Sequence, residues 1–259
     1  MKLVFSDLDG TLLEERSYSF FYAKPALRLL KKLGVPVVLV TSKTMGEVLH
    51  WQKKLGIDGP FICENGAAIF IPKDYFHFKI PMAKEENGWL IIWLSEGISS
   101  IKKFVEKMRK DGFEIEALTE MTVNRAAKLT GLSVSLAREA KKRDFDECIL
   151  LHRGNIADFK IRAGKSGISV VEGGGFYHLC AGHDKGKAVK ILLEFFEKKF
   201  GAVESTGIGD SENDFPMLDA VDFGYLVRKA DGSYASKKFE KANAKNSKGW
   251  AEIISSIFS

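Results

Sequence analysis

Both ends of the chain show continuous apolar runs that alternate with segments of helical periodicity. Runs without polar interruption are typical of parallel strands that are covered on both faces. The segments between them carry apolar residues at helical spacing, and several of them end at a glycine, as helices often do. This alternation predicts a doubly wound parallel sheet, a Rossmann-like α/β fold. The apolar runs expected to form its strands are 3–5, 35–40, 61–63, 205–208 and 223–227.

The middle of the chain has a different pattern, in which helices and strands no longer alternate regularly. An amphipathic helix over 101–108 is followed by two shorter helices, and two neighbouring strand candidates are joined by three glycines. We therefore expect an α+β cap, residues 83–182, inserted into a core domain formed by residues 1–82 and 183–259. A lysine-rich polar loop is expected between the last core strand and the last helix.

The composition is that of a globular protein without a membrane segment. The 259 residues are 45% hydrophobic and 28% charged, which suffices for a sizeable core and a solvated surface. No apolar run approaches the roughly 20 residues that span a bilayer. The first strand begins at residue 3, so we expect no signal peptide and a cytoplasmic protein. Cys63, Cys148 and Cys180 are widely spaced, which favours buried reduced thiols over zinc ligands or disulfides.

The net charge of +5 arises from lysines that are spread along the chain. Nucleic-acid binding uses a clustered basic face, often with aromatic side chains, and this sequence shows neither. We therefore expect no nucleic-acid partner. A positive surface instead favours a small anionic substrate.

Two carboxylates one residue apart follow the first apolar run, in the segment Asp7-Leu8-Asp9-Gly10-Thr11. Like charges this close at the end of a buried strand are unfavourable unless a cation lies between them or one is protonated. Gly10 allows a sharp turn and a close approach of the backbone to a ligand. A simple turn after a strand would need only one of the two acids. The pair therefore indicates a functional site.

Four of the expected strands end in polar residues. Ligands of an open parallel sheet bind beyond the carboxyl ends of its strands, so these residues should converge. Taken alone, the segment 209–214 could be a capped helix start, and a lone Lys185 before an apolar helix is usually a solvated lysine. Carboxylates, a hydroxyl and a lysine together favour binding of a phosphoryl group. The polar ends are Asp7 with Asp9, Thr41 with Ser42, Glu64 with Asn65, and Asp210 with Asp214.

These motifs resemble those of the haloacid dehalogenase superfamily, most of whose members are magnesium-dependent phosphatases. The match covers the whole chain, and the insert resembles the cap of the Cof-type branch. In sequence order, the matching residues are Asp7-x-Asp9, Thr41, Lys185, and Asp210 with Asp214.

The resemblance implies a role for each of these residues. Asp7 would attack phosphorus and form an aspartyl-phosphate, and Asp9 would protonate the leaving oxygen and later activate water. Mg²⁺ would be held by Asp7, the backbone carbonyl of Asp9, and Asp210, with Asp214 supporting it at close range. The residues expected to hold the phosphoryl oxygens are Thr41, Ser42, Lys185 and Asn213.

A narrower resemblance is to the mannosyl-3-phosphoglycerate phosphatases within this branch. It rests on the runs 41–44, 60–69, 129–132 and 174–179. It implies hydrolysis of a substrate with a phosphate, a carboxylate and a mannose, in the synthesis of mannosylglycerate. These phosphatases often carry an arginine where this chain has Gly175, so a substrate contact made by that arginine would be lost or replaced. The candidate substrate contacts are Lys43, Asn65, Arg125 and Lys128.

Three other functions are compatible with parts of the pattern. The chain could be a phosphatase for another sugar phosphate, or a phosphotransferase like the phosphomannomutases, which share the aspartyl-phosphate. It could also be a non-catalytic binding domain on the same fold. The intact set of acids argues against the last possibility, because a binding domain has no need for so unfavourable a cluster.

Overall fold

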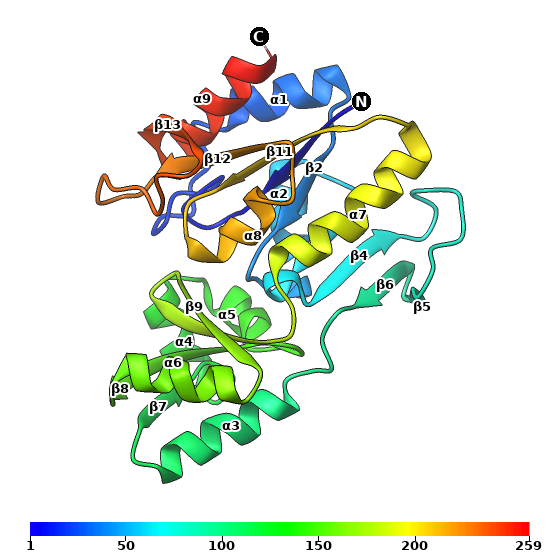
Figure 1. The fold of residues 1–259 in the computed structure, drawn as a ribbon. Coiled ribbons are helices and arrows are strands. Elements are labelled where there is room, and N and C mark those ends of the chain that lie inside the picture. Colours follow the sequence, from blue (N-terminus) through cyan, green and yellow to red (C-terminus); the bar gives the residue numbers. More distant parts are fainter. Residues whose placement is uncertain (259) are drawn as a thin grey trace.

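The computed structural model describes residues 1–258 and contains two β-sheets with helices on both faces of each (Figure 1). The larger sheet has the strand order β13-β12-β11-β1-β2-β3-β4-β6-β5. The strands from β13 to β3 are parallel, and β4, β6 and β5 continue the sheet in antiparallel pairs. Its strands are β1 (Lys2–Ser6), β2 (Val37–Val40), β3 (Phe61–Cys63), β4 (Ala68–Pro72), β5 (Lys84–Glu86), β6 (Trp89–Trp93), β11 (Glu204–Gly209), β12 (Phe223–Arg228) and β13 (Glu240–Lys245).

Helices cover both faces of this sheet. Alternate residues of β1 point to opposite faces, so Val4 packs with helices α1, α2 and α9, and Phe5 packs with α7 and α8. The doubly wound fold predicted from the apolar runs is thereby confirmed. The helices are α1 (Lys24–Leu33), α2 (Met45–Leu55), α7 (Lys185–Phe200), α8 (Phe215–Leu218) and α9 (Asn246–Phe258), with 3₁₀ turns η1 (Glu64–Gly66) and η2 (Glu212–Asp214).

The smaller sheet is antiparallel, with the order β7-β8-β10-β9, and lies below the larger sheet in Figure 1. One face packs against α3 and α6, and the other against α4 and α5. These elements are α3 (Ser99–Lys110), β7 (Glu114–Ala117), α4 (Val123–Thr130), α5 (Val134–Ala140), β8 (Glu147–Arg153), α6 (Ile156–Lys165), β9 (Ile168–Gly173) and β10 (Phe176–Ala181).

Two sequence-based expectations need correction. The expected cap, 83–182, begins too early, because β5 and β6 pair with the larger sheet; we propose that the cap begins after Trp93. The expected polar loop contains strand β13, in which Ala242 is the buried side chain among charged and polar residues. Lysine-rich edge strands of this kind resist further pairing and lack the apolar run by which strands are recognised.

Two findings bear on the other expectations. Within residues 1–258, no helix is long and apolar enough to cross a membrane. Cys63, Cys148 and Cys180 are buried and unpaired, as expected for reduced thiols.

Candidate active site

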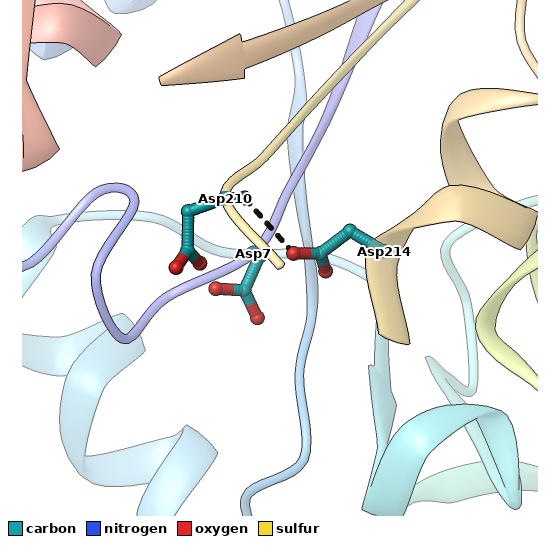
Figure 2. A group of neighbouring side chains, drawn as sticks. All are labelled: Asp7, Asp210 and Asp214. Carbon is teal, nitrogen blue, oxygen red and sulfur yellow. Dashed lines mark hydrogen bonds between the residues drawn. The ribbon is translucent and has the colours of Figure 1, made fainter. Parts of the chain in front are cut away.

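Three carboxylates meet at the carboxyl edge of the larger sheet (Figure 2). Asp7 follows β1, Asp210 follows the neighbouring parallel strand β11, and Asp214 ends η2. One oxygen from each lies within 4.8 Å of the others. Adjacent parallel strands end at the same edge, so the fold itself brings these acids together.

Glycines allow the two loops that carry these acids to approach each other. A Cβ atom at Gly209 would lie 2.5 Å from Asp214, and one at Gly10 would lie 2.9 Å from a carboxylate oxygen of Asp210. Gly10 also has a φ of +79°, a backbone conformation that favours glycine. Asp214 Oδ2 accepts hydrogen bonds from the backbone N–H groups of Asp210 (3.0 Å) and Ser211 (3.1 Å), the first of which is drawn in Figure 2. The capped turn considered from the sequence is therefore present as part of the acid cluster.

Lys185 connects two of the acids from the start of α7. Its Nζ lies 2.7 Å from Asp7 Oδ1 and 2.6 Å from Asp214 Oδ1, and the side chain is almost fully buried. Burial alone would lower the pKa of Lys185, but the two carboxylates raise it above its usual value. Lys185 is therefore charged, and it offsets one of the three negative charges.

The remaining negative charge fits a divalent cation. Burial raises the pKa of Asp7 to about 7, although Lys185 acts to lower it. Burial and the neighbouring Asp214 and Asp7 raise the pKa of Asp210 well above its usual value. Raised pKa values mean that these carboxylates are unfavourable in the ionised form unless positive charge neutralises them, which is typical of metal sites. A set of ligands made only of oxygen atoms suits a hard cation.

Asp9 has one oxygen held by the protein and one that is free. Its Oδ2 lies 2.8 Å from Lys43 Nζ, whereas its buried Oδ1 has no hydrogen-bond partner within residues 1–258. Lys43 also lies 3.5 Å from Glu47, and these two carboxylates raise its pKa against the effect of burial. Lys43 was expected to contact the substrate, but in this structure its ammonium group is paired with Asp9.

The residues expected to hold phosphoryl oxygens lie around the same edge. Thr41 is fully buried, and its Oγ1 accepts the backbone N–H of Lys43 at 3.2 Å. Ser42 lines the cavity described below. Asn213 is nearly buried, and its Nδ2 donates to Asn65 Oδ1 at 3.1 Å. Their contacts to a phosphoryl group remain predictions.

A cavity of about 690 Å³ separates the acid cluster from the cap. Its volume is in the range of small-molecule sites, and it reaches the acids at Asp9 and Asp210. The cap is seated against the core around it: Tyr18 donates to the carbonyl of Thr130 at 2.6 Å, and Thr44 donates to that of Glu139 at 3.1 Å. The cap residues that line the cavity include Lys128, Thr130, Gly131, Phe176 and His178.

The structure separates the two cap cations that were expected to contact the substrate. Lys128 lines the cavity. Arg125 is exposed, is absent from the cavity lining within the described residues, and donates to both carboxylate oxygens of Glu116 at 3.1 and 3.2 Å. Residues three apart on a helix face roughly the same side, but this short helix directs only one of them to the cavity. A substrate contact by Arg125 stays a prediction, and in this structure its guanidinium is paired with Glu116 instead.

Sequence reasoning missed a buried polar cluster between the cap and the core. It contains Arg143, Asp146 and His178 of the cap and Glu64 and Asn65 of the core. Asn65 was expected as a polar strand end and a substrate contact, and its turn joins the antiparallel strands β3 and β4. Charged residues at positions 143–146 look solvated in a sequence, and only long-range packing buries them.

Fold and site together define a capped α/β protein with an acid-rich centre suited to a divalent cation. A family model for haloacid dehalogenase-like hydrolases matches residues 4–254. The chain is 45% identical to a glucosyl-3-phosphoglycerate/mannosyl-3-phosphoglycerate phosphatase from Persephonella marina, over 97% of this chain and 95% of that protein. It is 36% identical to a mannosyl-3-phosphoglycerate phosphatase from Pyrococcus furiosus, over 88% and 91%. A haloacid dehalogenase-like hydrolase structure from B. subtilis superposes with a TM-score of 0.66 at 20% identity, over 98% and 99%.

The chain belongs to the haloacid dehalogenase-like hydrolase family. The family predicted from the sequence motifs is thereby confirmed, as is the expected resemblance to phosphatases named for mannosyl-3-phosphoglycerate.

Proposed function

We propose that this protein is a Mg²⁺-dependent phosphatase that hydrolyses mannosyl-3-phosphoglycerate and glucosyl-3-phosphoglycerate to the free hexosylglycerate and phosphate. The relatives' names supply the substrate class. The observation that carries the chemistry is that the nucleophile candidate Asp7 clusters with Asp210, which lines the cavity together with Asp9, whose Oδ1 has no hydrogen-bond partner within the described residues. A hexosyl phosphoglycerate has the size of ligand that a cavity of this volume accommodates.

Asp7 acts as the nucleophile in this proposal. Lys185 holds Oδ1, which leaves the other carboxylate oxygen for attack on phosphorus. The P–O bond to the glycerate breaks as the Asp7 O–P bond forms, and water later releases phosphate from the aspartyl-phosphate. Asp7, Asp210 and the backbone carbonyl of Asp9 would hold Mg²⁺, which supplies positive charge for the phosphoryl oxygens. Both oxygens of Asp214 already accept hydrogen bonds, so its support of the cation is expected through water.

Asp9 acts as the acid and then the base. Its free Oδ1 donates a proton to the departing glycerate oxygen and afterwards takes one from the attacking water. The pairing of Oδ2 with Lys43 fixes the orientation of the carboxyl group during both transfers. Lys43 is in this view a residue that positions Asp9.

The test is a phosphate-release screen over mannosyl- and glucosyl-3-phosphoglycerate, hexose phosphates and phosphoglycerates. We expect the two hexosyl phosphoglycerates to give the highest kcat/KM and a chelator to abolish release. Faster release from a simple hexose phosphate would identify that ester as the substrate and would leave the proposed phosphatase reaction unchanged. Isomerisation of a hexose phosphate without net phosphate release would instead indicate a phosphotransferase.

The cap should provide specificity, because the core motifs recognise only the phosphoryl group. If Lys128 pairs with the substrate carboxylate, Lys128→Ala should lower kcat/KM for the hexosyl phosphoglycerate about tenfold or more, since charge-assisted hydrogen bonds are the stronger ones. A small aryl phosphate without a carboxylate should be hydrolysed at the unchanged rate. Arg125→Ala on the same helix is the matched control and should alter neither value. An equal loss for both substrates in Lys128→Ala would contradict a carboxylate contact.

A further inference from the structure

The turn Glu64–Asn65–Gly66 has an unfavourable backbone conformation and is buried. Glu64 and Asn65 both have positive φ angles, 44° and 57°, which non-glycine residues rarely adopt. A Cβ atom at Gly66 would lie 2.1 Å from the carbonyl oxygen of Asp184, so the turn packs directly against the start of α7 that carries Lys185. Strained backbone persists where surrounding contacts hold it, and such residues concentrate at functional sites.

Asn65 bridges the cap and the acid-bearing loop. Its Nδ2 donates to Asp146 Oδ2 at 2.8 Å and lies 3.3 Å from His178 Nδ1, and both partners belong to the cap. Its Oδ1 accepts from Asn213 Nδ2 at 3.1 Å. Burial would raise the pKa of Asp146, but the guanidinium of Arg143 holds it below its usual value. An ionised carboxylate only accepts hydrogen bonds, so Asp146 fixes which way the Asn65 amide faces.

The orientation of Asn65 in turn fixes that of Asn213. Asn213 donates one Nδ2 hydrogen to Asn65, and its Oδ1 accepts from the hydroxyl of Ser211 at 2.7 Å. The second Nδ2 hydrogen takes part in neither of these two bonds. Without Asn65, Ser211 would remain as a partner in this set, but its hydroxyl can donate or accept and therefore does not fix which way the Asn213 amide faces.

The same turn also anchors the cap backbone. The Glu64 carboxylate accepts the N–H groups of Asp144 (3.2 Å), Phe145 (2.9 Å) and Asp146 (3.1 Å), which lie immediately before β8. The cap is thus bound to the residue next to Asn65. A seated cap therefore places Asp146 where it orients the Asn65 amide.

We propose that Asn65 is a positioning residue that, when the cap is seated, orients the Asn213 amide toward the phosphoryl group. This rests on the proposed phosphatase function. It predicts that removal of the Asn65 side chain slows hydrolysis even of a substrate that makes no cap contact through a sugar or carboxylate.

The first test is Asn65→Gly, which removes the side chain and tolerates the positive φ. We expect kcat/KM for a small aryl phosphate and for the hexosyl phosphoglycerate to fall by a similar factor, about tenfold or more. Asn87→Gly is the matched control, because Asn87 also has a positive φ (49°), also precedes a glycine in a hairpin of the same sheet, and is exposed. It should retain wild-type activity. Thermal unfolding of both variants reports any loss of the fold, and wild-type kcat/KM in folded Asn65→Gly would overturn the proposal.

A double-mutant cycle separates positioning from general structural damage. If Asn65 acts through Asn213, the double variant Asn65→Gly/Asn213→Ala should be no slower than Asn213→Ala alone. If the factors by which the two single substitutions lower kcat/KM multiplied in the double variant, the two residues would have independent roles, and the proposal would be refuted. If the wild type itself released no phosphate from any ester, the proposed function would fail first, so the two failures are distinguishable.

Asn65→Asp tests the connection to the cap. This variant retains an oxygen for Asn213 but places a second carboxylate against Asp146, which we expect to unseat the cap and slow hydrolysis about tenfold or more. Its activity relative to wild type should recover as the pH falls, because a protonated carboxyl can again donate to Asp146. Wild-type activity of Asn65→Asp at neutral pH would refute the cap connection.

Discussion

The Asp7→Asn variant should release no measurable phosphate from any substrate, including small aryl phosphates. An amide is a poor nucleophile, and it also removes one of the negative charges that would bind Mg²⁺. Lys185 retains Asp214 as a partner at 2.6 Å, so the substitution does not leave a buried ammonium group unpaired. Two measurements check this prediction: phosphate release, and mass spectrometry of the enzyme, in which we expect no phosphorylated form of the variant. Appreciable turnover by this variant would exclude Asp7 as the nucleophile.

A stability measurement shows whether this loss arises from chemistry or from unfolding. Burial raises the folded-state pKa of Asp7 to about 7 from a usual value of 3.8. The folded protein therefore binds the proton more tightly than the unfolded chain between these pH values, and this group's contribution to the free energy of unfolding decreases as the pH rises through that range. Asparagine has no such titration. Without Mg²⁺ and above pH 7, Asp7→Asn should unfold at the same temperature as the wild type or higher.

The Asp9→Asn variant should lose about 10²- to 10⁴-fold in kcat on the hexosyl phosphoglycerate, the usual contribution of general acid–base catalysis. Mg²⁺ affinity should change little, because the metal contact assigned to Asp9 is its backbone carbonyl. The free Oδ1 of Asp9 belongs to a carboxyl group that can donate and accept the proton. The asparagine amide can do neither. Isothermal titration with Mg²⁺ and steady-state kinetics measure the two effects separately.

An aryl phosphate with a good leaving group sharpens this prediction. Its departure needs little protonation, so Asp9→Asn should form the aspartyl-phosphate readily but hydrolyse it slowly. The expected result is a burst of phenolate equal to the enzyme concentration, followed by slow turnover. Wild-type steady-state rates with both substrates would show that Asp9 is not the acid or base.

The sequence by itself determined the core of the fold and the acids of the site. Continuous apolar runs and glycine-terminated helices are local signals, and they specify the doubly wound sheet whose strands β1 and β11 end side by side. Asp7, Asp210 and Asp214 could be placed together for that reason, and Lys185 because it begins the helix that follows the cap. These positions depend on which strand or helix a residue ends or begins.

The tertiary structure decided which side chains face one another across distant parts of the chain. Lys43 pairs with Asp9, Lys128 rather than Arg125 reaches the cavity, and β13 is a strand because β12 offers it an edge. Asn65 bonds to Asp146, which lies 81 positions further along the chain, and to Asn213, which lies 148 positions further along. No local propensity encodes such pairs, because their energies arise only when burial removes the side chains from water and leaves each polar atom to find a partner.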